Sequence, residues 1–298
     1  MILNLTYPDK GNITFKHIKY PDGQQSIELL KWGWVVGESG NNITEFHKQL
    51  LDIDIEIKSH FNTFMDLEMI ICANQALKEL GFKTINLYVP WFMSARSDRK
   101  FGLGTSNYLK TVICPIINSQ NFNRVTVMHP HSDVLEATLN NFHKIDNLDV
   151  VKFAIYDLSN TIIDNSTKYT LVSPDGGSLK MVYNIAKALD YDGDVIIASK
   201  YRDITTGKIL STDVPLSEVK DYGKFIIVDD IIDGGRTFIE LAKAIKKYYP
   251  NNKVYLIVTH GIFSAGYTEL KEYIDAIYCT NSVKDINEEP YIKQLNIY

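Results

Sequence analysis

Short apolar runs that end abruptly at polar residues recur along this chain, and they limit its possible folds more than any other feature. The runs are rich in Val and Ile and have the length of mainly buried strands. They lie at 53–59, 84–91, 124–131, 169–177, 194–200, 224–230 and 253–261. Helical patterns lie between several of them, at 66–80 and 237–249. Strands that alternate with helices predict an α/β fold with mainly parallel sheets.

The series of strands and helices occurs twice, once before about residue 147 and once after it. The chain has 298 residues, which suits two domains of about 150 residues each. We therefore predict two similar domains, 1–147 and 148–298. Ligands of an open parallel sheet bind at the carboxyl ends of its strands, where the polar residues of this chain gather.

Composition excludes several classes of function. A hydrophobic fraction of 45% and a charged fraction of 22% are ordinary for a soluble globular protein, and the net charge of -5 argues against nucleic-acid binding. The chain has neither an apolar run of membrane-spanning length nor a signal-like start. The chain has three widely spaced cysteines, Cys72, Cys114 and Cys279. An odd number at such spacing favours reduced thiols in a cytoplasm over disulfides or a zinc site.

Two adjacent aspartates end the apolar run at 224–230, and a glycine pair follows closely. Two like charges repel unless they bind cations or accept hydrogen bonds, and a sugar diol or a magnesium-bound sugar provides both. The glycine turn opens a helical pattern, where backbone amides form a cradle for phosphate. Asp229 and Asp230 beside Gly234 and Gly235 therefore suit a ribose 5-phosphate group. The alternative is a helix entry at which the aspartates only cap the first turn.

This segment, VDDIIDGGRT at 228–237, closely resembles the phosphoribosyl-binding signature of type I phosphoribosyltransferases. Further motifs occur in order along the chain: VPWFMSARSDRK at 89–100, RVTVMHPHSD at 124–133, VSPDGG at 172–177, SKYR at 199–202 and THGIFS at 259–264. Together they resemble the ribose-phosphate pyrophosphokinases, also called phosphoribosyl pyrophosphate synthetases. The resemblance extends from YPDGQ at 20–24 to about residue 264.

The resemblance implies two type I phosphoribosyltransferase-like domains, Mg²⁺ as cofactor and ATP as co-substrate. It also implies a homo-oligomer, a dimer or larger, whose active sites are completed between subunits. The implied reaction moves the β,γ-diphosphate of ATP to the anomeric hydroxyl of a ribose 5-phosphate group and releases AMP. Such a transfer needs alignment, and cations that hold the charge of the transferred group.

The resemblance also assigns residues to the transfer step. Lys200 and Arg202 match the catalytic Lys-any-Arg pair, whose positive charges would close over the diphosphate. His131 matches the histidine that serves magnesium-ATP, and His129 stands where the family has an aspartate. Asp175 matches a second metal-site aspartate, although the residue that the family places between this aspartate and the glycine pair is absent here.

Two further motifs match segments that contact ATP. Arg96, Ser97 and Asp98 match a stretch in which the family has glutamine at the position of Ser97. The segment 20–24 matches a stretch that grips adenine from a neighbouring subunit, and its matching residues are Tyr20, Asp22 and Gln24. Gln24 replaces a carboxylate, and its amide oxygen can still accept a hydrogen bond from the adenine amino group.

The sugar-phosphate loop departs from the family pattern. By resemblance, the residues that bind the sugar phosphate are Asp229, Asp230, Asp233, Gly234, Gly235, Arg236 and Thr237. Gly234 replaces a threonine whose hydroxyl would donate to the phosphate, a bond worth roughly 1.5–3 kcal/mol to a charged oxygen. Arg236 adds a cation that could pair with a second phosphate. The roomier, more cationic loop slightly favours ADP-ribose, as in NAD rebuilding, over ribose 5-phosphate as acceptor.

Two other readings stay open beside this one. A non-catalytic regulatory relative would also keep the fold, but the chain retains Lys200, Arg202, Asp229, Asp230 and His131. A phosphoribosyltransferase that consumes the activated sugar would explain the loop at 228–237 alone. It would not explain the motifs at 89–100 and 124–133, or the doubled domain.

Overall fold

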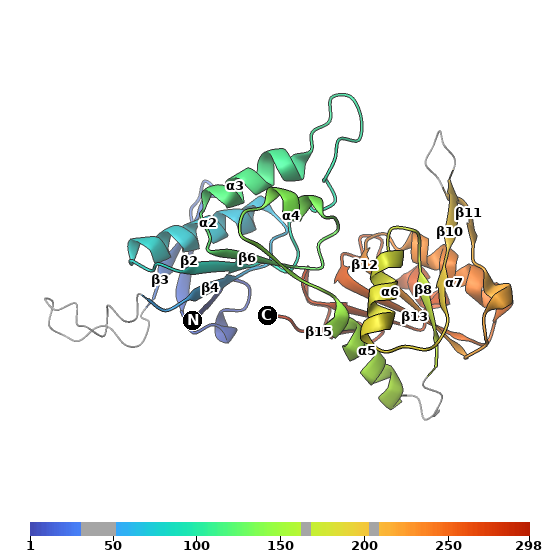
Figure 1. The fold of residues 1–298 in the computed structure, drawn as a ribbon. Helices are drawn as coiled ribbons and strands as arrows, with labels where there is room; N and C mark the ends of the chain where they lie inside the picture. The colour runs from blue at the N-terminus through green and yellow to red at the C-terminus, as the bar shows by residue number, and fades with distance from the viewer. Residues whose placement is uncertain (31–51, 162–167, 203–208) are drawn as a thin grey trace, which may run out of the picture. The chain divides into compact units, whose positions relative to one another are not determined.

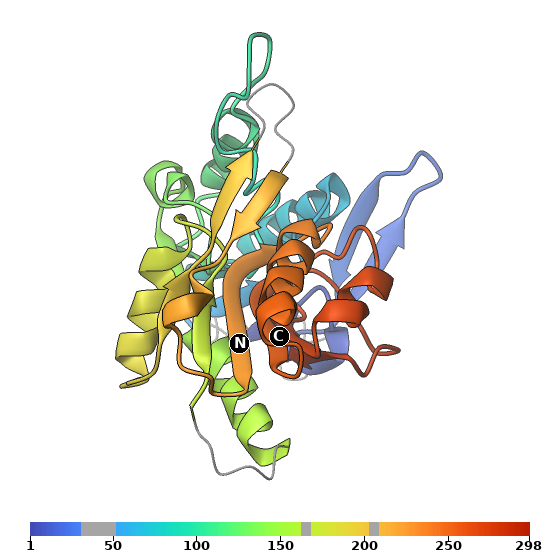
Figure 2. The ribbon, with the colours of Figure 1, turned by 90° about the vertical axis from the view of Figure 1, so that its right-hand side faces the viewer.

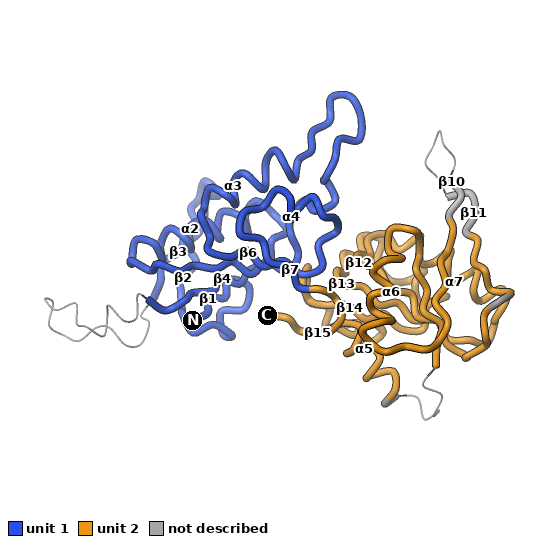
Figure 3. The backbone as a smooth tube through the Cα atoms, in the orientation of Figure 1, with its two compact units in different colours: residues 1–145, 298 blue, residues 146–297 orange. Residues whose placement is uncertain are grey.

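The computed structural model describes residues 1–30, 52–161, 168–202 and 209–298. The chain forms two compact units, residues 1–145 with 298 and residues 146–297 (Figure 3). We call them unit 1 and unit 2. Within the described residues, no helix is long and apolar enough to cross a membrane.

Unit 1 is built on a five-stranded sheet in the order β1-β4-β5-β6-β7, in which all paired strands are parallel (Figure 1). Its strands are β1 (Ile2–Asn4), β4 (Ile55–Lys58), β5 (Ile85–Tyr88), β6 (Arg124–Met128) and β7 (Phe142–Ile145). Among its described residues, the α-helices are α2 (Phe64–Glu79), α3 (Cys114–Ser119) and α4 (Val134–Thr138). Helix α2 starts at a capping box, in which Thr63 and Asp66 bond each other's backbone amides.

An antiparallel hairpin of β2 (Phe15–Lys19) and β3 (Gln25–Leu29) also belongs to unit 1. Gln25, which is 4% exposed and follows the turn of the hairpin directly, bonds it to α2, since its backbone amide and its side-chain amide both donate to the carboxylate of Glu68. The exposed turn itself, residues 20–24, extends away from the rest of the unit (Figure 2). The sequence patterns did not predict this hairpin, because the apolar residues of its strands, FKHIK and QSIEL, are scattered and only partly buried.

Unit 2 has a six-stranded sheet in the order β15-β14-β13-β12-β8-β9, again with only parallel pairs. The strands are β8 (Thr170–Ser173), β9 (Val195–Ile197), β12 (Lys224–Ile232), β13 (Lys253–Gly261), β14 (Ala276–Thr280) and β15 (Ile292–Leu295). The helices are α5 (Leu148–Thr161), α6 (Leu179–Ala188), α7 (Arg236–Tyr248) and α8 (Thr268–Tyr273). A second antiparallel hairpin joins β10 (Ser199–Arg202) to β11 (Ile209–Asp213). The predicted α/β class with mainly parallel sheets is confirmed.

Strand β12 is longer than its apolar run, and this corrects the expectation that the aspartate pair lies where the strand leaves the sheet. Asp229 pairs with Val258 of β13, and pairing continues to Ile232 opposite Gly261. On its other side, β12 pairs with β8 only as far as Ile227. The aspartates therefore sit within a strand that has a neighbour on one side and an open edge on the other.

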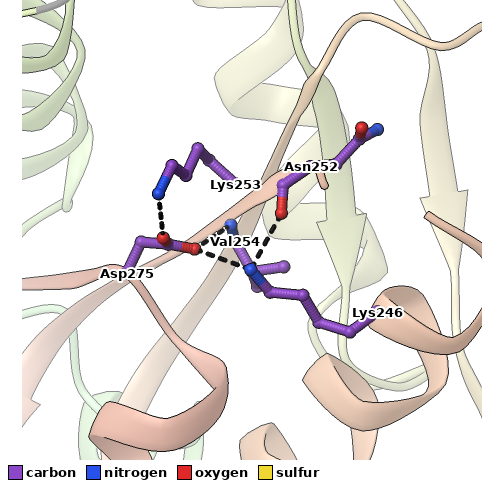
Figure 4. Close-up of polar contacts among 5 residues, drawn as sticks. All are labelled: Lys246, Asn252, Lys253, Val254 and Asp275. Carbon is purple, nitrogen blue, oxygen red and sulfur yellow. Dashed lines mark hydrogen bonds and ion pairs between the residues drawn. The ribbon is translucent and has the colours of Figure 1, made fainter. Parts of the chain in front are cut away.

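The opposite end of the unit 2 sheet is held by a carboxylate between strands (Figure 4). Asp275, just before β14, accepts hydrogen bonds from Lys246 Nζ (3.0 Å), Lys253 Nζ (2.7 Å) and the backbone amide of Val254 (2.9 Å). Burial raises the pKa of Asp275, but these hydrogen bonds outweigh burial and hold the pKa below its ordinary value. This contact joins α7, β13 and β14 away from the carboxyl ends of the strands.

Candidate active site

Carboxylates gather at the carboxyl end of the unit 2 sheet. Asp229 and Asp230 are on β12, and Asp175 is in the loop that follows the neighbouring strand β8. Oδ1 of Asp229 accepts a hydrogen bond of 2.6 Å from the hydroxyl of Ser178 and one of 3.0 Å from the backbone amide of Asp230. The open edge of β12 thus faces the loop after β8 and receives its polar groups.

The charge state of Asp229 reflects this crowding. Burial raises its pKa most, the charges of Asp230 and Asp175 raise it further, and the bonds from Ser178 and the Asp230 amide lower it; the result is a pKa of about 7. Withdrawal from water and like charges both disfavour the carboxylate. A group that brings positive charge or hydroxyl donors to this place would relieve that cost, which is a property of ligand sites.

The loop after β8 is a tight turn around Asp175. Its Oδ1 accepts from the backbone amides of Gly177 (3.0 Å) and Ser178 (3.3 Å), and its backbone oxygen accepts from the hydroxyl of Ser173 (2.7 Å). The turn leads directly into α6 and carries Ser178 to Asp229. Sequence reasoning missed Ser178, because the residue that follows the glycine pair gives no signal of its own without the position of β12.

The sugar-phosphate loop, residues 233–237, leads from β12 into α7. Gly235 has φ 79°, a left-handed conformation that glycine adopts at little cost, and a β-carbon there would meet the side chain of Leu270 at 3.0 Å. It is the N-cap of α7, and as a glycine it has no side chain with which to cap the helix. Gly234 and Arg236 are exposed, and Asp233 and Thr237 are partly so.

The ATP-binding candidates of unit 1 follow two adjacent strands. Arg96, Ser97 and Asp98 lie in the loop after β5; Arg96 is exposed, and Ser97 and Asp98 are partly buried. Backbone oxygens fix this loop, since that of Ser97 accepts from the amide of Leu109 (3.1 Å) and that of Asp98 from the side chain of Asn107 (2.5 Å). Strands β5 and β6 are neighbours, so the loop after β6 starts beside it.

The loop after β6 carries both histidines of the predicted metal-ATP motif. His131 is exposed, whereas His129 is 9% exposed and its amide donates to the backbone oxygen of Ile145 (2.6 Å). His129 has φ 39°, which is unusual for a residue with a side chain. The sharp bend after the buried strand thus turns the chain so that His131 reaches the surface.

The remaining candidates lie on the hairpins. Tyr20, Asp22 and Gln24 form the exposed turn between β2 and β3, where the Asp22 carboxylate accepts from the Gln24 amide (3.1 Å). Lys200 and Arg202 are on β10, before residues 203–208, and their side chains lie outside the part of the chain that the structure describes.

Metal ligation was predicted for His131 and Asp175, which belong to different units. Among the described residues, no three His, Cys, Asp or Glu side chains are arranged to hold a metal ion by themselves. Mg²⁺ is usually bound by one or two carboxylates together with water and substrate phosphates. The carboxylates around Asp229 are of the donor type that fits such a shared site.

Comparison with known proteins first defines the class. The phosphoribosyl transferase domain family matches residues 140–292. Over the whole chain, the fold is similar to that of phosphoribosylpyrophosphate synthetase from Mycobacterium smegmatis, with a TM-score of 0.75 at 16% identity and 94% of that chain covered. The protein therefore has the phosphoribosyltransferase fold.

Sequence relatives then narrow the class. The chain is 30% identical to a ribose-phosphate pyrophosphokinase from Mycoplasmopsis pulmonis, over 79% of this chain and 70% of the relative. It is 24% identical to a ribose-phosphate pyrophosphokinase from Pyrococcus furiosus, over 92% of this chain and 88% of the relative. The chain belongs to the ribose-phosphate pyrophosphokinase family and is an ATP-dependent diphosphotransferase of that type.

Proposed function

We propose that this protein transfers the β,γ-diphosphate of ATP to ribose 5-phosphate. The anomeric oxygen forms a bond to the β-phosphorus, the bond between that phosphorus and the oxygen bridging to the α-phosphate breaks, and AMP leaves. The products are phosphoribosyl pyrophosphate and AMP. The observation that carries the proposal is the hydrogen-bonded carboxylate cluster around Asp229, placed beside a glycine loop at the start of α7.

The cluster and the loop suit the two ends of the acceptor. Asp229 and Asp230 would accept hydrogen bonds from the 2- and 3-hydroxyls of the ribose, which would stabilise the charged form of Asp229 that burial and the Asp230 charge disfavour. The backbone amides at Gly235, Arg236 and Thr237, at the first turn of a 13-residue helix, would bind the 5-phosphate. Asp233 would complete the loop.

ATP would be bound by unit 1. Arg96, Ser97 and Asp98 are assigned to contacts with ATP, and His131 to its magnesium ion. A tip formed by Tyr20, Asp22 and Gln24 would hold adenine in a neighbouring copy of the chain, in keeping with the outward position of the hairpin. The assembly would thus be a homo-oligomer.

Transfer would be completed in unit 2 by Lys200 and Arg202, whose charges would stabilise the diphosphate as it moves. Asp175 would share a Mg²⁺ ion with the substrates. When bound, this ion would neutralise phosphate charge during the transfer.

A direct assay tests the proposal. The full chain is incubated with ATP, MgCl₂ and ribose 5-phosphate, and products are identified by mass spectrometry. AMP, together with a sugar that has gained two phosphoryl groups, is the expected result. ATP left intact under these conditions would contradict the proposal and favour the regulatory alternative. ADP formed instead of AMP would contradict transfer of the diphosphate.

ADP-ribose is a second candidate acceptor, because the loop has room beside the phosphate. A β-carbon at Gly234 would meet no atom closer than 4.0 Å, and Arg236 is exposed next to it. In ADP-ribose the 5-phosphate is joined to a second phosphate. This second phosphate could extend through the opening and lie near the Arg236 guanidinium. The same assay with ADP-ribose in place of ribose 5-phosphate tests this alternative.

A further inference from the structure

The connections after β12 and β13 run side by side in unit 2. The two strands pair up to Ile232 and Gly261, and the backbone amide of Ile262 then donates to the oxygen of Ile232 (2.8 Å). One connection is the sugar-phosphate loop, and the other is the turn at 262–266 that carries Ser264. The strands thus deliver both segments to the same end of the sheet.

Ser264 lies beside Gly234, a position that has no side chain. A β-carbon at Gly234 would be 4.0 Å from the hydroxyl oxygen of Ser264, with no other group as close. A threonine at this position would carry its hydroxyl one bond from that β-carbon. The Ser264 hydroxyl therefore lies close to where the hydroxyl of a threonine at position 234 would be.

The turn that carries Ser264 is fixed by its neighbours. Phe263 is 4% exposed and has φ 54°, and its backbone oxygen accepts from the amide of Gly266 (3.1 Å). Its ring lies where a β-carbon on Gly261 would be, and packs edge-on against Tyr267 with 5.1 Å between ring centroids. Because Phe263 is locked on both sides, the backbone of Ser264 is held in place before any ligand arrives.

We propose that Ser264 is a phosphate-binding residue of the acceptor site. Its hydroxyl donates to a 5-phosphate oxygen and replaces, from the turn after β13, the donor that Gly234 does not provide. This inference rests on the proposed function, because it places the 5-phosphate at the start of α7. It also explains how a loop with glycine at position 234 can bind a terminal phosphate without losing a side-chain donor.

The test is a cycle of variants of the full chain: Ser264→Ala, Gly234→Thr and the double variant. Ser264→Ala should weaken ribose 5-phosphate binding, measured by calorimetry, by about tenfold to a hundredfold, the range for a bond to a charged group. It should leave the binding of ribose, which has no phosphate, unchanged. Adding Gly234→Thr should bring the affinity for ribose 5-phosphate back to within a few-fold of wild type, because the threonine supplies the missing hydroxyl.

Two controls separate binding from structure. Thr268→Ala removes an exposed hydroxyl from the first residue of α8, just after the same turn, and should not alter the affinity. Ser264→Thr keeps the donor and should bind ribose 5-phosphate nearly as well as wild type. Thermal unfolding of each variant shows whether the turn survives.

The outcomes decide the inference separately from the function. If Ser264→Ala behaves as Thr268→Ala does, or if its loss is not repaired by Gly234→Thr, the inference is overturned. If wild type forms no AMP with ribose 5-phosphate but binds it in a manner that depends on Ser264, the proposed function fails and the inference stands. If wild type binds no ribose 5-phosphate, both fail.

Discussion

The hydroxyl of Ser178 donates a hydrogen bond of 2.6 Å to Oδ1 of Asp229, and the two residues are 51 positions apart in the sequence. This bond favours the charged form of a carboxylate whose pKa is raised by burial and by the charges of Asp230 and Asp175. In the proposed function, Ser178 would be a positioning residue, which orients Asp229 and sets the pH range in which Asp229 would accept from the acceptor hydroxyls.

The first prediction concerns the pH dependence of acceptor use. In the proposed site, Asp229 accepts from the acceptor hydroxyls as a carboxylate, so kcat/KM for the acceptor should fall as the pH drops through about 7. Ser178→Ala removes a bond that lowers this pKa, so the midpoint should move to higher pH. Ser178→Thr keeps the donor and should keep the midpoint. A profile whose midpoint is the same in Ser178→Ala and wild type would show that Ser178 does not tune Asp229.

The second prediction concerns stability. The folded protein raises the pKa of Asp229 from 3.8 to about 7. Below pH 4 the Asp229 carboxyl is protonated in the folded protein, and the free-energy cost of burying its charge is absent. Above pH 7 the carboxyl is charged and the full cost is present. The free energy of unfolding should therefore fall as the pH rises from 4 to 7. Asp229→Asn stays neutral and can still accept from Ser178. It should therefore resist urea better than wild type at pH 8, while the gain shrinks towards pH 4.

The same variant should bind the acceptor more weakly, because one amide oxygen replaces two carboxylate oxygens. Asp229→Asn would thus be more stable and less active. Equal urea midpoints for the two proteins at pH 8 would argue that Asp229 carries no such cost.

The strands of both sheets that carry the candidate residues could be predicted from sequence, because they are buried on two faces and read as continuous apolar runs. The end of β12 could not, since its two aspartates resemble a strand end and only the pairing with β13 extends it to Ile232. Strand β15, with the sequence IKQL, has no apolar run to detect.

The candidate site likewise contains residues that sequence patterns predict and residues that they do not. Asp229, Gly235 and Asp175 are found by local pattern, since each belongs to a short motif. Ser178 and Ser264 are not, because their roles depend on which loops meet at the end of the sheet. Hydroxyl residues are common on any surface, and tertiary structure alone selects these two.

The third prediction concerns the pair on β10. Lys200→Ala and Arg202→Ala should each lower kcat by about 10²–10³-fold, the usual effect of removing a preorganised group that stabilises the transition state. KM for the acceptor should change much less, because the pair is assigned to the transferred diphosphate. Lys247→Ala, which removes an exposed lysine of α7, is the control and should keep wild-type rates. Near-normal kcat in both β10 variants would remove the pair from the mechanism.

The fourth prediction concerns the carboxylate between strands in Figure 4. Asp275→Ala leaves the amide of Val254 without its acceptor and removes two lysine contacts, so the free energy of unfolding should fall by roughly 1–3 kcal/mol. The pKa of Asp275 is below its ordinary value, so this stability is present at neutral pH and is lost as the pH falls through the acidic range. Denaturant titration at pH 7 and pH 3 measures both effects.

The control for this variant is Asp192→Ala, which breaks an exposed ion pair with Lys168 and should change stability little. If the two variants unfold alike at pH 7, the Asp275 contacts do not hold the strands. Acceptor KM should be unchanged in both, because neither residue lies at the carboxyl ends of the strands.

The last prediction concerns acceptor choice. We expect the room beside Gly234 to let a second group extend from a bound 5-phosphate, and Arg236 at the first position of α7 could pair with a second phosphate. Gly234→Thr should fold, because a β-carbon has room there, but its side chain would narrow the exit. The ratio of kcat/KM for ribose 5-phosphate to that for ADP-ribose should therefore rise in this variant, by about tenfold if one favourable contact of the esterified phosphate is lost.

Arg236→Ala should raise the same ratio, because only ADP-ribose carries a second phosphate. The change should shrink as salt increases, since the guanidinium is exposed and its attraction is screened. Both specificity constants are measured for wild type and the two variants at low and high salt. If neither substitution changes the ratio of the two specificity constants, the loop does not bind the second phosphate. Glycine at position 234 would then be part of a site for ribose 5-phosphate alone.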